Sequence, residues 1–126
     1  MVTTEVSQLS RECNAWREVL RSHRHQFSQL KHSLQDIAGR QTQSDVLREI
    51  EHLDNQFHIQ LINIHDLKQC IKAHDRKMSM EMTEKDGHIS DDTLAKHENL
   101  FDDYQRLEHT LHEIRQEFDY FVRQTR

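Results

Sequence analysis

The chain of 126 residues has no proline, two glycines and two cysteines, and aromatic residues make up 6% of it. Such a composition disfavours sheets, catalytic loops and the glycine-rich loops that hold phosphates, and it favours long helices. The two cysteines, Cys13 and Cys70, are too few for a disulfide framework and are expected as reduced thiols. The composition therefore predicts an all-α protein.

Long apolar runs and a concentration of positive charge are also missing. No ten apolar residues stand together, and the N-terminus lacks the pattern of a secretory leader. The net charge is -5, with +2 in residues 1–40, -3 in residues 41–86 and -4 in residues 87–126, and no basic stripe suits phosphates. We therefore expect a soluble, cytoplasmic protein that binds neither membrane nor nucleic acid.

What the sequence does contain is a regular heptad pattern. Apolar residues recur every three and four positions in three long stretches, which is typical of helices that bury one narrow face against a partner helix. The repeated positions of the first stretch are Val6, Leu9, Cys13, Trp16, Leu20, His23, Phe27, Leu30, Leu34 and Ile37. Those of the second include Ile50, Phe57, Ile64, Ile71 and Met78, and those of the third are His97, Leu100, Tyr104, Leu107, Leu111, Ile114, Phe118 and Phe121.

The two glycines separate these stretches. Gly39 and Gly87 each follow the end of a heptad run, where a left-handed residue commonly ends a helix. Thr42 and Ser44 are placed to cap the second helix, and Ser90 is placed to cap the third. The chain is predicted as one domain, residues 1–126, with helices at about 4–38, 43–83 and 91–123.

Short connections make neighbouring helices antiparallel, so the predicted fold is an up-down-up three-helix bundle of long, coiled-coil-like helices. Counting outward from each turn then assigns residues to common levels. The count places Phe27, Phe57, Phe118 and Phe121 together near the first turn, and it places Trp16, Leu67 and Leu107 in one layer.

Two polar residues interrupt the predicted core. His23 occupies a heptad core position, and the same count places it level with Gln60. A hydrogen-bonded pair of these side chains would define helix register at some cost in stability, as a buried asparagine does in coiled coils. We favour this structural interpretation over a ligand pocket around the two residues, because buried polar groups are normally paired.

Eleven histidines raise the question of a metal site. A carboxylate-bridged di-iron bundle needs two inward Glu-x-x-His pairs, and this chain has one, Glu49 to His52, whose histidine is predicted to point outward. No Cys-x-x-Cys hairpin preorganises a zinc site either, and a buried cysteine is ordinarily a small apolar residue, so we favour no metal and no other cofactor. The residues near the second turn that match a zinc shell in type are Cys13, Cys70, His74 and His97.

The second predicted helix carries more apolar residues than one seam needs. Ile59 and Ile62 lie off the seam, and a helix with apolar residues around its circumference is normally covered on more than one side. These two residues therefore mark a homodimer contact or a partner groove, or they are isolated surface aliphatics.

In architecture the whole chain resembles a spectrin-type repeat, with three antiparallel heptad helices and a tryptophan in the first, in Leu9-Ser-Arg-Glu-Cys-Asn-Ala-Trp16. Its helices are longer than that family's, and the third has no tryptophan. The chain is also similar to small uncharacterised bacterial helical-bundle proteins, which supply no activity. Because spectrin-type repeats link and space other proteins, the resemblance implies a scaffold role.

No catalytic arrangement is expected, because continuous helices have no free amides away from their ends to hold an oxyanion. The sequence therefore favours a non-catalytic helical interaction or scaffold protein that forms a homodimer or binds another helical protein. The alternative is a metal-binding bundle that uses inward-facing histidines and cysteines.

Overall fold

The computed structural model describes residues 2–84 and 87–125, and their side chains from residue 6 onward. These residues form three helices and no strand, which confirms the predicted all-α three-helix bundle. Each helix boundary lies within two residues of the predicted one. The helices are α1 (Val2–Ala38), α2 (Ser44–Glu84) and α3 (Asp91–Thr125).

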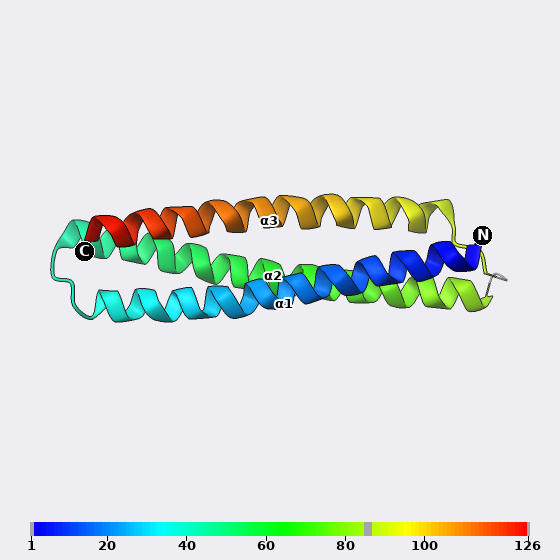
Figure 1. The fold of residues 1–126 in the computed structure, drawn as a ribbon, viewed down its shortest axis with the longest axis horizontal. Coiled ribbons are helices and arrows are strands. Elements are labelled where there is room, and N and C mark those ends of the chain that lie inside the picture. Colours follow the sequence, from blue (N-terminus) through cyan, green and yellow to red (C-terminus); the bar gives the residue numbers. More distant parts are fainter. Residues whose placement is uncertain (1, 85–86, 126) are drawn as a thin grey trace.

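The helices form a long rod in which α2 runs antiparallel to α1 and α3 turns back alongside α2 (Figure 1). At 1.5 Å per residue each helix is roughly 50–60 Å long. The backbones of α1 and α2 pack most closely, those of α2 and α3 less so, and α1 and α3 approach each other least. Contacts between α1 and α3 therefore depend mainly on long side chains.

The predicted heptad positions form the core. Phe57 lies between two other phenylalanines, with its ring centroid 5.6 Å from that of Phe27 and 5.5 Å from that of Phe118, both in edge-to-face geometry. Three of the four phenylalanines predicted to cluster near the first turn are therefore in contact, and the fourth, Phe121, is also buried. Buried apolar residues continue along the rod in all three helices: Leu20, Leu34, Leu53, Ile64, Ile71, Met78, Leu100, Leu111 and Ile114.

The second connection follows the sequence prediction. Gly87 has a φ of +84°, a left-handed conformation that favours glycine. Ser90 caps α3, because its Oγ accepts a hydrogen bond from the backbone N–H of Thr93 at 3.2 Å. The buried Glu81 carboxylate accepts hydrogen bonds from the Ser90 N–H, at 2.8 Å, and from the Thr93 hydroxyl, and so ties the end of α2 to the start of α3.

The first connection differs from the prediction. Gly39 is not left-handed, because the N–H groups of Arg40 and Gln41 donate to carbonyls three residues back and already end the helix. The N-cap position of α2 is Gln43, whose carbonyl accepts the N–H of Leu47 at 3.0 Å, so neither of the expected hydroxyl residues, Thr42 and Ser44, occupies it. The prediction of how α1 ends and α2 begins, made from residue types alone, was therefore wrong.

The register of the helices also differs from the count. Lys31 pairs with Asp54 at 2.9 Å, about three residues beyond the expected level. Trp16 stacks on Phe101 and Tyr104, with ring centroids 5.6 and 5.8 Å away, so it does not share a level with Leu107. The count assumed symmetric turns, and small shifts at each turn add up along the rod.

None of the described helices combines the length and the apolar character that crossing a lipid bilayer requires.

Candidate metal centre

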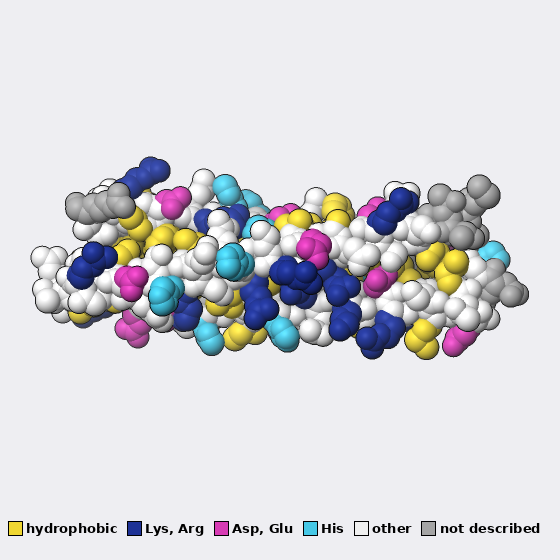
Figure 2. Space-filling model, turned by 60° about the horizontal axis from the view of Figure 1, so that its bottom comes forward, with side chains coloured by type: hydrophobic (Ala, Val, Ile, Leu, Met, Phe, Trp, Pro, Cys, Tyr) yellow, Lys and Arg dark blue, Asp and Glu magenta, His cyan; other side chains and the backbone are white. Residues whose placement is uncertain are grey.

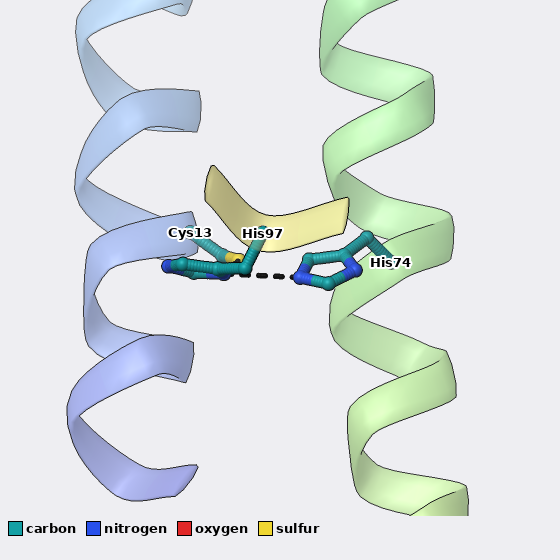
Figure 3. Close-up of side chains that lie close together, drawn as sticks. All are labelled: Cys13, His74 and His97. Carbon is teal, nitrogen blue, oxygen red and sulfur yellow. Dashed lines mark hydrogen bonds between the residues drawn. The ribbon is translucent and has the colours of Figure 1, made fainter. Parts of the chain in front are cut away.

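Three of the four predicted metal-ligand candidates meet in the core. Cys13 of α1, His74 of α2 and His97 of α3 are all buried, and one ligand atom from each lies within 4.8 Å of the other two. Figure 3 shows these side chains meeting between the helices, with His97 facing both others. Within residues 2–84 and 87–125 they are the one set of three such donors that converges in this way.

Two of the three separations between donor atoms are close to those of a tetrahedral site, and the third, between the donors of Cys13 and His74, is no more than 4.8 Å. His74 Nε2 lies 3.0 Å from His97 Nδ1, and Cys13 Sγ lies 3.9 Å from the same nitrogen. Metal–nitrogen bonds of about 2.0–2.1 Å and a metal–sulfur bond of about 2.3 Å place tetrahedral donors about 3.3 Å apart for two nitrogens and about 3.6 Å for nitrogen and sulfur. Side-chain shifts of a few tenths of an ångström bring both of these distances to the tetrahedral values.

A carboxylate determines which nitrogen of His97 faces the cluster. Glu12 Oε1 lies 2.8 Å from His97 Nε2, and because a carboxylate only accepts, Nε2 carries the hydrogen. In the neutral ring the lone pair is then on Nδ1, where the Nε2–H of His74 and the thiol of Cys13 converge. A carboxylate behind a histidine is the arrangement that orients metal-binding imidazoles.

The hydrogen bonding leaves one buried atom without a partner. With Nε2 of His74 used as the donor to His97, Nδ1 of His74 has no hydrogen-bond partner among the described residues. A buried polar atom of this kind normally has a partner or a functional reason. The hydrogen bonds within the cluster therefore leave one of its polar atoms, Nδ1 of His74, unsatisfied.

The electrostatics of the cluster disfavour free charge on its donors. Burial, followed by the nearby charges of Asp75 and Glu12, raises the pKa of the Cys13 thiol to about 12. Burial, followed by the neighbouring His97, lowers the pKa of His74 to about 4. The thiol and the His74 imidazole are therefore neutral near pH 7, while two carboxylates beside them attract a cation.

An aromatic stack covers the cluster. The Trp16 ring lies 4.9 Å from the His97 ring, centroid to centroid, and Phe101 and Tyr104 continue the stack on Trp16. A cover of this kind excludes water and lowers the local dielectric constant, which strengthens bonds to an ion. Glu12 is the partly exposed neighbour of the cluster, since its side chain is 40% exposed while that of His97 is 6% exposed.

The fourth candidate ligand lies elsewhere. Cys70 is exposed and Cys13 is buried, and both are free thiols, so neither a disulfide between them nor a four-residue zinc shell is formed. Cys70 flanks the seam of α2, whereas His74, four residues later, occupies the seam itself. The inclusion of Cys70 was therefore wrong.

The predicted pair of His23 and Gln60 is not formed. His23 Nε2 donates to Glu108 at 3.0 Å, and His23 Nδ1 accepts from Arg115 at 3.1 Å. Gln60 is buried, and its Oε1 accepts from Asn63 on the same helix at 3.2 Å. His23 faces α3 instead of α2, and the proposed pocket between His23 and Gln60 is lost with the pair.

Sequence reasoning missed the role of Glu12. This residue directly precedes the seam residue Cys13, a position that lies at the edge of a coiled-coil interface and commonly carries charge. A carboxylate at that position beside an inward histidine on another helix was the available signal. Recognising it requires knowing that α1 and α3 meet at this level.

Comparison with protein families, with curated proteins and with solved structures found no match to this chain. The three-helix architecture that the spectrin-type resemblance implied is present, but no family match supports a relationship to spectrin-type repeats. The similarity to bacterial helical-bundle proteins likewise has no support from these comparisons.

Proposed function

We propose that this protein is a metal-binding helical bundle in which Cys13, His74 and His97 hold one zinc ion. The observation that carries the proposal is the convergence of these three donors, one from each helix, within 4.8 Å of one another. Two imidazoles and a thiolate are ligands that favour zinc, whereas calcium and magnesium bind oxygen ligands.

The surrounding charges support a dication. Asp75 and Glu12 hinder loss of the Cys13 proton in the absence of a metal, since they oppose a third negative charge. A divalent cation reverses that balance, because it is attracted to both carboxylates and displaces the thiol proton. The site therefore favours a bound metal thiolate over a free thiolate.

The single tryptophan allows the proposal to be tested by optical spectroscopy. Protein purified without a histidine tag and stripped with a chelator should bind one equivalent of Co²⁺, with thiolate-to-cobalt charge-transfer absorption. Because the Trp16 ring lies 4.9 Å from His97, Co²⁺ should quench its fluorescence, and Zn²⁺ should restore it by displacing the quencher.

Cys13 and Cys70 provide a matched pair of variants. Cys13→Ser should abolish the charge-transfer band and weaken Co²⁺ binding by at least about tenfold, whereas Cys70→Ser should leave both unchanged because this thiol is exposed and outside the cluster. A chain that stays helical and takes up no stoichiometric Co²⁺ or Zn²⁺ at micromolar concentration contradicts the proposal. Equal loss in both variants also contradicts it.

Self-association is a second candidate function, favoured by the outward face of α2. Ile59 and Ile62 are 39% and 48% exposed, three residues apart on one helix, and lie outside the core. We propose that this face contacts a second helical chain, a second copy of this protein in the simplest case, which is consistent with a scaffold role and needs no catalysis.

Sedimentation at several concentrations tests this second candidate. Self-association should weaken in Ile59→Asp and in Ile62→Asp, since each buries a charge in the contact. Val19→Asp is the matched control, because Val19 is a similarly exposed aliphatic residue, 37% exposed, on α1. A wild-type chain that remains monomeric at all concentrations rules the contact out.

A further inference from the structure

Basic side chains gather where α1 and α2 meet. Arg17, Arg21 and Arg24 are four and three residues apart, so they lie on one side of α1. Lys68 of α2 is half-buried, and burial, followed by the positive charges of Arg21, Arg24 and Arg17, lowers its pKa, so the charges of all three arginines act on it. We call these four residues the basic strip. The expectation that no basic stripe suits phosphates was therefore wrong, because Lys68 joins the arginines only when α2 packs on α1. Figure 2 shows Lys and Arg side chains gathered along the middle of one face of the rod.

Few carboxylates oppose the strip. Residues 19–35 of α1 contain no aspartate or glutamate, although the whole chain has a net charge of -5. Glu18 pairs with Arg21 at 3.0 Å, but both side chains are more than 60% exposed, and such surface pairs contribute little. The side chains that line a shallow recess of about 260 Å³ beside the strip are Arg21, Arg24, His25 and Ser28.

The rest of this surface carries hydrogen-bonding side chains. Every exposed position from Arg21 to Ser33 is arginine, histidine, serine or glutamine, with no aliphatic side chain and no phenylalanine, tyrosine or tryptophan among them. A partner helix would find no apolar seam here, and a nucleic acid base would find imidazole and guanidinium planes but none of the large aromatic rings on which bases stack best. Charge and hydrogen bonding are what this surface offers.

The spacing of the charges selects an extended anion. At 1.5 Å per residue, Arg17 and Arg24 are about 10 Å apart along the helix axis. One orthophosphate ion does not span that distance, whereas a chain of linked phosphates does. Guanidinium groups match phosphate oxygens in planar, bidentate geometry, and serine hydroxyls are common additional donors to them.

We propose that the basic strip binds a linear inorganic polyphosphate chain, which lies along the α1–α2 boundary over Arg17, Arg21, Arg24 and Lys68. Negative charge at this position relieves the repulsion among the four cations. The strip and the metal centre use different side chains, so this proposal does not depend on the metal.

Calorimetric titration of the full chain with tripolyphosphate and with longer linear polyphosphate at low salt tests the proposal. The double variant Arg21→Gln/Arg24→Gln should bind the longer chain at least about tenfold more weakly, and the slope of log affinity against log salt should fall by about two. The matched control is Arg106→Gln/Arg123→Gln, which removes two exposed arginines from α3 and should leave binding unchanged.

Several results overturn the proposal. These are no binding by the wild-type chain at low salt, unchanged binding by the strip variant, and equal loss in the α3 control. Binding of polyglutamate or of single-stranded RNA, matched in charge, as tightly as polyphosphate also overturns it, since the strip would then attract anions without selecting phosphate chains. Far-ultraviolet circular dichroism of each variant checks that the helices remain folded.

Discussion

The two ends of the rod follow the same heptad pattern but contain different chemistry. Near the first connection, the level of Phe27, Phe57 and Phe118 is filled by aromatic rings. Toward the second connection, the equivalent positions carry Cys13, His74 and His97. Glu81 and Thr93 lie nearer the turn, and all five of these polar or ligating side chains are buried. A heptad repeat therefore specifies that a side chain is buried, but leaves open whether that burial stabilises the fold or builds a site.

The difference has an energetic consequence. Apolar rings gain free energy from burial alone, at about 25 cal/mol per Å² of apolar surface. Buried polar groups lose their hydrogen bonds to water, and this cost is offset only where each donor and acceptor is paired within the protein. Nδ1 of His74 has no such partner among the described residues. We therefore expect the aromatic end to provide most of the stability and the polar end to respond to metal and to pH.

The largest effect should come from the aromatic end. Phe57→Ala removes a ring that is fully buried between two others, and should lower the free energy of unfolding by about 3–5 kcal/mol. Tyr120→Ala, which removes an aromatic ring that is 65% exposed, should cost less than about 1 kcal/mol. Urea unfolding measures both, and similar costs would contradict the place of Phe57 at the centre of the aromatic cluster.

The second effect should be a loss of stability in acid at the polar end of the metal-free protein. The pKa of His74 is lowered from 6.5 to about 4 by burial and by His97, so between these values the unfolded chain binds more protons than the folded one. Stability therefore falls as the pH drops from 7 to 4, by about 3 kcal/mol. Urea midpoints across this range should vary less in His74→Gln than in the wild type, and parallel curves would refute the prediction.

Zinc should stabilise the polar end by a comparable amount. A ligand at 100 times its dissociation constant adds about 2.7 kcal/mol to the free energy of unfolding when it binds the folded state alone. The thermal midpoint should rise with zinc in the wild type and in Phe57→Ala, since the aromatic cluster is remote from the donors. It should not rise in Cys13→Ser, and a rise there would show that zinc acts elsewhere.

The carboxylate behind His97 should have a smaller effect, confined to metal binding. Glu12→Gln keeps the shape of the side chain but removes the charge that orients His97, so affinity for zinc should fall by about 10- to 100-fold. Competition with a chromophoric chelator measures the affinity. Glu18→Gln, an equivalent change at an exposed residue of α1, should leave it unchanged, and a similar loss there would indicate a general effect of charge.

The smallest effect separates the two helix caps. Ser90→Ala removes the side chain that accepts the Thr93 N–H and should cost about 1 kcal/mol. Ser44→Ala should change the free energy of unfolding by less than about 0.5 kcal/mol, because the cap of α2 is Gln43. Chemical denaturation of the two variants in parallel decides this, and equal costs would restore Ser44 as a cap.

The helices and their buried faces were predictable, since they depend on local properties. The spacing of Leu20, Phe27 and Leu34 is a property of one helix, and all three are fully buried as expected. The left-handed Gly87 was also predictable, because glycine adopts a positive φ without steric cost and the heptad run ends before it. Gly39 shows the limit, because the same residue type ended a helix there without a positive φ.

The candidate site was only partly predictable. His74 and His97 could be recognised as inward residues, but Cys70 was included and Glu12 was missed. Which residues of different helices meet depends on the turns and on the rotation of each helix about its axis, and His23 pairs with Glu108 of α3 instead of Gln60 of α2. Pairing across helices therefore could not be read from any one of them.

By itself the sequence determined three helices, their lengths and the side of each that is buried, because hydrogen bonding and heptad spacing act within a single helix. The tertiary structure decided that Cys13, His74 and His97 meet while Cys70 faces solvent. The reason is geometric: one residue advances a helix by about 1.5 Å and turns it by about 100°, so small shifts in register determine which side chains touch.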